Sequence, residues 1–117
     1  MIKSAIIGFF IISSLAPTCT RVKKSPKLCV ESLKEQLLAT PPQLPALSIW
    51  EYKYKGNTVY LVPAPCCDQF NPVYNLECEV ICHPDGGITG KGDGKCTDFH
   101  STASDKKLVW QDSRSIK

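Results

Sequence analysis

The fold is decided by the stretch Ile49-Trp50-Glu51-Tyr52-Lys53-Tyr54-Lys55-Gly56-Asn57-Thr58-Val59-Tyr60-Leu61-Val62. Its first half alternates aromatic with charged side chains, which is the period-2 pattern of a strand that buries one face. Its second half ends in a short apolar run, and Gly56-Asn57 between the halves suits a two-residue turn. The stretch therefore predicts a β-hairpin.

The register of this hairpin follows from the position of its turn. A turn at Gly56-Asn57 pairs Tyr54 with Val59 and places the aromatic row and the aliphatic residues on one face. The other face then carries Lys53 opposite Tyr60, and we expect it to lie on the outside. The aromatic face is expected to be core, because such a row is more often core than a platform for a ligand.

An amphipathic helix is predicted before the hairpin. Ser25-Pro26 is a good helix start, since Ser can cap the first N–H groups and Pro is tolerated at the first helical position. Cys29, Leu33 and Leu37 follow at i, i+4 and i+8, and polar residues cover the opposite side. Pro41-Pro42 ends the pattern. The helix thus presents one apolar face that contains a cysteine.

The remainder of the chain predicts short elements joined by many turns, in keeping with nine prolines and seven glycines among 117 residues. Cys78–Cys82 reads as a short strand or turn and Lys107–Gln111 as a last strand, with a Gly-rich loop between them. We therefore predict an α+β fold. It is a small disulfide-stapled domain in which one N-terminal amphipathic helix packs on a short antiparallel sheet.

The N-terminal segment predicts export. Lys3 precedes an apolar run that is far too short to span a bilayer, as in a signal peptide. Pro17 would follow the scissile bond of an ordinary cut after Ala16 and would hinder it, so the better site is a lipobox that ends at Cys19. The chain then divides into a signal peptide (1–18), a basic tether (19–27), a single disulfide-rich domain (28–112) and a polar tail (113–117).

Cys19 is accordingly the candidate lipid-attachment residue, and the alternative is that it leaves with the signal peptide. We expect an extracytoplasmic protein, either a membrane-anchored lipoprotein of the periplasm or outer membrane or a secreted protein. Its first partner is then the membrane, reached through the N-terminal lipid. The basic tether reads as a solvated linker, and contact with anionic lipid headgroups is the alternative.

Seven cysteines support this division, because an odd count in an exported chain needs an explanation. With Cys19 lipidated or removed, six cysteines remain, and an oxidising compartment favours their pairing in three disulfides. The adjacent Cys66 and Cys67 are expected to bond to two separate partners. Six cysteines allow 15 connectivities, and spacing alone does not choose among them. The disulfide candidates are Cys29, Cys66, Cys67, Cys78, Cys82 and Cys96.

The Gly-rich loop invites a metal interpretation. Asp85, Asp93 and Asp98 supply the hard oxygens that calcium prefers, so loop 85–98 is a candidate site for a calcium-stabilised domain. Its spacing matches no EF-hand, and the more ordinary interpretation is a turn-rich loop held by Cys82 and Cys96 without any cofactor. Zinc is disfavoured because no cysteines have the Cys-x-x-Cys spacing, and the loop lacks the Lys-Ser or Lys-Thr of a phosphate-binding loop.

The sequence contains no pattern typical of an enzyme. His83 and His100 are the only side chains that could act as a base near neutral pH, and neither lies in a nucleophile motif. A net charge of +3 is too mild to indicate nucleic-acid binding. We therefore expect a non-catalytic binding or structural module with an unidentified protein or glycan ligand. A protease-inhibitor-like module is an alternative, since Cys82 and Cys96 bracket Asp85-Gly86.

Three segments together resemble an uncharacterised domain family of small secreted or lipid-anchored bacterial proteins. They are Tyr52–Tyr60, Cys66-Cys67-Asp68-Gln69-Phe70, and Ile81–Cys96 followed by Asp98-Phe99. The resemblance covers residues 49–112 and implies export and one folding unit, but no activity. The family often has another residue at the position of Cys78, so the resemblance implies a bond peculiar to this chain, with Cys29 as the candidate partner.

Overall fold

The computed structural model describes Gly8, residues 25–66 and residues 68–116. The expected signal peptide apart from Gly8, the lipidation candidate Cys19 and the adjacent cysteine Cys67 lie outside the described residues. The elements are α1 (Pro26–Leu38), β1 (Ser48–Tyr54), β2 (Asn57–Leu61), β3 (Val73–Tyr74), β4 (Val80–Cys82), α2 (Phe99–Thr102) and β5 (Ser104–Gln111). The α+β fold class is confirmed. Within the described residues, neither helix has the length and apolar character needed to cross a membrane.

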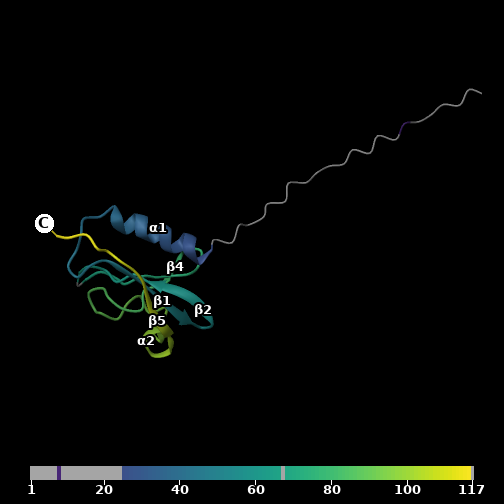
Figure 1. Cartoon of the computed structure of the whole chain (residues 1–117). Coiled ribbons are helices and arrows are strands. Elements are labelled where there is room, and N and C mark those ends of the chain that lie inside the picture. The colour runs from purple at the N-terminus through teal and green to yellow at the C-terminus, as the bar shows by residue number, and fades with distance from the viewer. Residues whose placement is uncertain (1–7, 9–24, 67, 117) are drawn as a thin grey trace, which may run out of the picture.

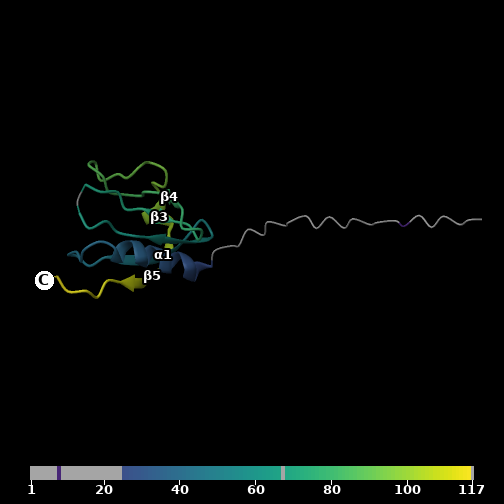
Figure 2. The same ribbon diagram turned by 90° about the horizontal axis from the view of Figure 1, so that it is seen from above.

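The five strands form one antiparallel sheet in the order β4-β3-β2-β1-β5. Helix α1 lies along one face of this sheet, and α2 with the long loops lies on the other (Figures 1 and 2). The sheet is therefore covered on both faces. Because both faces are covered, the central hairpin buries large apolar side chains on each of its two faces.

Helix α1 buries its predicted apolar face against the sheet. Cys29 and Leu33 are buried and pack with Ile49 and Tyr60 of the central strands. The expectation that Tyr60 lies on an outer face is wrong, because its side chain is 1% exposed beneath α1. A helix with an apolar stripe needs an apolar partner, and the second face of the hairpin supplies it.

The opposite face of the hairpin forms a second core cluster, as the aromatic row predicts. Tyr54, Val59 and Val73 are buried there around Phe99, which belongs to α2 and is fully buried. The ring of Tyr52 meets Phe99 edge-on, at 5.1 Å between ring centroids. The aromatic residues of the hairpin thus pack against α2 and the loops that flank it.

The register of the hairpin differs from the predicted one by two residues. Tyr54 pairs with Asn57 and Tyr52 with Val59, so the turn is Lys55-Gly56 and not Gly56-Asn57. Both turn residues have positive φ, 49° and 77°, which is the requirement of the type I′ turns that match strand twist. A shift of two positions keeps every side chain on its face, and the predicted aromatic face therefore survives the error.

The polar tail begins with an anchor for α1. Asp112 is buried, and its carboxylate accepts hydrogen bonds from Arg114 at 2.8 to 3.1 Å. Arg114 also donates to the carbonyls of Leu38 and Thr40, at 3.3 and 2.9 Å. These are carbonyl groups left over at the end of a helix. The side chain of residue 114 therefore fastens the end of α1 to the strand β5 that precedes it in the chain.

Two disulfides hold elements that are distant in sequence. Cys29–Cys78 joins α1 to the segment before β4, and Cys82–Cys96 closes the Gly-rich loop. The bond between Cys29 and Cys78 that the family resemblance implies is thus confirmed. Because these four cysteines bond to one another, none of them is the partner of Cys66.

Candidate functional site

The most distinctive surface feature is the segment from Cys82 to Cys96, called here the cystine loop. Its backbone is folded on itself by three hydrogen bonds, from Asp93 N–H to the His83 carbonyl, from Gly92 N–H to the Gly86 carbonyl and from Gly90 N–H to the Gly87 carbonyl, each 3.0 or 3.1 Å long. All its glycines have positive φ. The loop that its composition predicts to be rich in turns is therefore closed by hydrogen bonds within its own backbone.

Asp93 is used inside the cystine loop. One carboxylate oxygen lies 3.0 Å from His83 Nδ1 and accepts the His83 backbone N–H at 3.1 Å. The other accepts the N–H of Lys95 at 3.0 Å. The hydrogen bond with the His83 side chain, aided by these N–H groups, lowers the pKa of Asp93 below its ordinary value. The Asp93 carboxylate thus joins the two strands of the loop near its neck.

Asp85 links the cystine loop to two other segments. Asn71 donates to one of its carboxylate oxygens at 2.5 Å, and His100 Nε2 lies 2.6 Å from the other. Asn71 in turn accepts the N–H of Ala64 at 2.7 Å. The carboxylate of Asp85 therefore bridges the loop after β2 and the short helix α2.

Asp98 takes part in a third contact, with a different partner. The Tyr54 hydroxyl donates to its carboxylate at 2.5 Å, which lowers the pKa of Asp98 and raises that of Tyr54. The three calcium candidates Asp85, Asp93 and Asp98 each serve a different neighbour. Within the described residues, no three Asp, Glu, His or Cys side chains converge as metal ligands would. The structure does not bring the predicted calcium ligands together.

The two histidines are likewise engaged in structural pairs. His83 pairs with Asp93 and stacks near Phe70, at 5.2 Å between ring centroids, and His100 pairs with Asp85. The hydroxyl of Ser101, beside His100, donates to the Asp98 backbone carbonyl and not to the histidine. Both histidines therefore make contacts that hold the loop in place. Their described contacts include no side chain that either imidazole could activate as a nucleophile.

Ile88 occupies the tip of the cystine loop and is 92% exposed. With Thr89 it forms the centre of the turn that the Gly90–Gly87 hydrogen bond closes. Phe70, 45% exposed, lies against Gly87, since a Cβ added there would be 2.7 Å from its ring. The tip therefore shows solvent an aliphatic side chain with an aromatic ring beside the preceding glycine. The signal in the sequence is a lone isoleucine among glycines and polar residues, which neither periodicity nor motif spacing singles out.

Gly92 and Gly90 provide a matched test of how tightly the cystine loop is closed. A Cβ at Gly92 would lie 2.0 Å from the His83 carbonyl oxygen, whereas at Gly90 it meets nothing within 4 Å, and both have φ near +70°. We expect Gly90→Ala to lower the free energy of unfolding by about 1 kcal/mol, the cost of a left-handed conformation. Gly92→Ala should cost about 3 kcal/mol, because the neck must also open. Urea unfolding measures both, and equal losses would contradict a closed neck.

The Asp93 contact also predicts a pH dependence. Because its folded pKa is below the unfolded one, the charged carboxylate contributes stability above the unfolded pKa of about 3.9 and loses it as pH falls through the folded pKa. The difference in unfolding free energy between the wild type and Asp93→Asn should therefore be largest near neutral pH. It should shrink below about pH 4. Urea unfolding from pH 7 to 2 tests this, and a constant difference would refute it.

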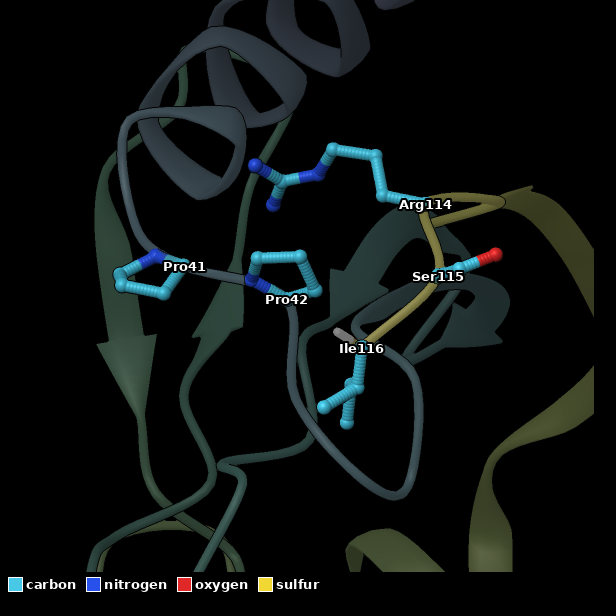
Figure 3. A pocket seen from close by; sticks show the side chains of 5 residues that line it. All are labelled: Pro41, Pro42, Arg114, Ser115 and Ile116. Carbon is cyan, nitrogen blue, oxygen red and sulfur yellow. The ribbon is translucent and has the colours of Figure 1, made fainter.

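A second surface feature is an open hollow of about 770 Å³ at the end of α1, lined by Pro41, Pro42, Arg114, Ser115 and Ile116. Figure 3 shows the Arg114 side chain extending beside Pro42 toward the end of the helix. The guanidinium is neutralised by Asp112 and donates to two carbonyls. The hollow thus presents mainly apolar rings and a charge that is already paired, and we regard the cystine loop as the better site.

Comparison with known proteins gives one match. A family model described as a domain of unknown function (DUF6970) matches residues 35–112, a range that contains all five strands and the end of α1. No curated protein and no solved structure matches the chain. The match agrees with the resemblance to an uncharacterised domain family and brings no activity with it.

Proposed function

The chain belongs to the DUF6970 family, whose function is unknown, and on that premise we propose that it is an exported, lipid-anchored domain that binds a partner without catalysis. One observation carries the proposal. The acidic and imidazole side chains of the cystine loop are paired in contacts that hold it in place, while the apolar Ile88 is 92% exposed. A loop that is held rigid in this way suits a binding surface better than a catalytic pocket.

Support for export comes from two separate observations. The disulfides Cys29–Cys78 and Cys82–Cys96 are compatible with an extracytoplasmic location, because cytosolic thiols are normally kept reduced. The sequence before the domain has the order of a lipoprotein signal that ends at Cys19. If Cys19 carries lipid, it is the odd cysteine and needs no disulfide partner.

Support for a binding role without catalysis or a metal comes from the pairing of the polar groups. Within the described residues, no buried side-chain nitrogen or oxygen lacks a hydrogen-bond partner. A site that binds a reacting group or an ion normally keeps polar atoms that the protein itself does not satisfy. We accordingly expect EDTA to leave the melting temperature of the domain unchanged.

Intact mass spectrometry of the protein from the membranes of its producing cells tests the proposal. We expect a chain that starts at Cys19, carries acyl chains and has no reactive thiol on Cys29, Cys78, Cys82 or Cys96. Cys19→Ala should move the protein from the membrane fraction to the soluble fraction, whereas Ser25→Ala, a matched change near the start of α1, should not. An unprocessed chain, or one that remains on the membrane without Cys19, would refute lipid anchoring.

A further inference from the structure

We propose that copies of this chain associate head to tail through the two edges of the sheet, with β4 of one copy lying against β5 of the next. The inference rests on the proposed function in that it takes the domain to bind a partner, and it identifies that partner as a second copy of the chain. The contact surfaces are the segment Glu77–Cys82 around β4 and the strand β5 itself.

The first argument is that both edges of the sheet are open. β4 and β5 are the outer strands of the order β4-β3-β2-β1-β5. Among the described residues, no backbone hydrogen bond from outside the sheet reaches residues 80–82 or 104–111. Val80, Ile81 and residues 104–108 are also exposed. An edge strand with such open N–H and C=O groups can accept the edge of another chain.

The second argument is that the two edges carry charges of opposite sign. Glu77 and Glu79 are exposed beside β4, whereas β5 carries the exposed Asp105, Lys106 and Lys107. Like charges placed opposite one another destabilise a strand pair, so the lysines hinder pairing between two β5 strands and the glutamates hinder pairing between two β4 strands. The same charges favour the pairing of β4 with β5.

The neighbouring charges leave these signs unchanged. Glu51 and Lys53 lie opposite β5 in β1 and cancel each other. The disulfide Cys29–Cys78 brings the start of α1, with Lys27, toward the β4 edge, and this cation leaves the two glutamates in excess. In the described part of the chain, the glutamates and lysines of the two edges form no salt bridge.

The third argument is the direction of the two strands. Successive antiparallel pairings lead from β4 through β3, β2 and β1 to β5, so the two edge strands run in the same direction. A copy that keeps its orientation therefore adds its β4 beside β5 as a parallel strand, with α1 on the same face of the joined sheet. Such a contact uses a different surface on each copy and so continues into a ring or a filament.

Parallel pairing also matches the side chains of the two edges. Glu79 is followed by Val80 and Ile81, 47% and 38% exposed, and Lys107 is followed by Leu108, 41% exposed. The same order in both segments brings a glutamate beside a lysine and aliphatic side chains beside one another. The pairs of Lys107 and Leu108 with β1 are consecutive and lie between the two irregularities of that pairing, so this part of β5 is regular.

Cysteine crosslinking of the full chain in its producing cells tests the proposal. Glu79→Cys and Lys107→Cys are introduced together, and the cell fraction that contains the protein is mildly oxidised. We expect a ladder of covalent dimers, trimers and larger species that a reducing agent removes, because each copy offers both edges. Only protein that retains Cys29–Cys78 and Cys82–Cys96 by mass is counted.

Matched variants fix the geometry of the contact. Glu79→Cys alone and Lys107→Cys alone should give no dimer, whereas the two single variants produced together should give dimers and no trimers. Leu44→Cys in place of Lys107→Cys should give no ladder, although Leu44 is 78% exposed and therefore accessible to chance collisions. Leu108→Ser added to the crosslinking pair should slow the ladder about tenfold, as loss of one aliphatic contact implies.

Sedimentation of the unmodified protein provides a second measurement that needs no added cysteine. The average mass should rise with concentration beyond that of a dimer, and more salt should lower it.

Several outcomes would overturn the inference. They are a protein that stays monomeric at every concentration, a dimer from either single variant alone, an equal ladder with Leu44→Cys, or crosslinks to another protein in place of a second copy. Processing at Cys19 is read separately by intact mass. The inference can therefore fail while export and lipid anchoring stand.

Discussion

Replacement of Cys29 and Cys78 together by alanine is expected to lower the free energy of unfolding by about 4 kcal/mol. The disulfide closes a loop of 49 residues and so removes much of the conformational freedom of the unfolded chain. It also holds Cys29, which is fully buried, in the cluster beneath α1. Since a domain of this size is stable by only about 5–15 kcal/mol, the loss is a large part of the total.

The second disulfide provides the control. Cys82 and Cys96 are separated by only 14 residues, so their joint replacement by alanine should cost about 3 kcal/mol. Double variants are compared in both cases, because a single replacement would leave a thiol behind. Urea unfolding of the oxidised proteins gives both values. A larger loss at Cys82 and Cys96 would show that loop closure in the unfolded chain does not decide the order.

Phe99→Ala is expected to lower the free energy of unfolding by about 3–5 kcal/mol, because it removes a large side chain from a site that cannot collapse easily. Phe99 is 0% exposed, and the rings of Tyr52 and Tyr54 lie 5.1 and 5.2 Å from it, centroid to centroid. α2 consists of only four residues, so its packing depends on this ring. Loss of the ring should also loosen His100, which lies next to it in the chain and pairs with Asp85.

The matched control is Ile88→Ala, which removes apolar atoms from a side chain that is already 92% exposed. Its effect on stability should stay within about 0.5 kcal/mol. Thermal and urea unfolding of Phe99→Ala, Phe99→Leu and Ile88→Ala measure the series, and Phe99→Leu should lie between the other two. A loss at Phe99 no larger than that at Ile88 would contradict the assigned core.

The main elements of the fold were predictable because their signals are local. Helix α1 follows from the spacing of Cys29 and Leu33 with Pro41-Pro42 beyond, and the hairpin follows from its alternation. The turn was misplaced by one residue because Gly56 serves equally well in the turn Lys55-Gly56 and in Gly56-Asn57. The two-residue strand β3 lies between prolines and polar residues and gives no periodic signal at all.

The candidate site was predictable in composition but not in geometry. A closed loop is indicated by Cys82, Cys96 and the glycines of residues 83–96, and the structure confirms it. The partners of Asp85 come from Asn71 and His100, which are 14 and 15 residues away in the chain. Such contacts depend on how α2 and the loop after β2 pack. The sequence therefore suggests calcium ligands, whereas in the structure the acidic side chains form hydrogen bonds that connect segments of the protein.

By itself, the sequence determined the fold class, the amphipathic helix and the aromatic face of the hairpin, because these depend on contacts between residues close in the chain. The tertiary structure alone decided that Tyr60 lies beneath α1 and that the three aspartates serve different neighbours. It also decided that Ile88 stands exposed on a braced turn. These features arise from packing between distant segments, which periodicity and spacing do not encode.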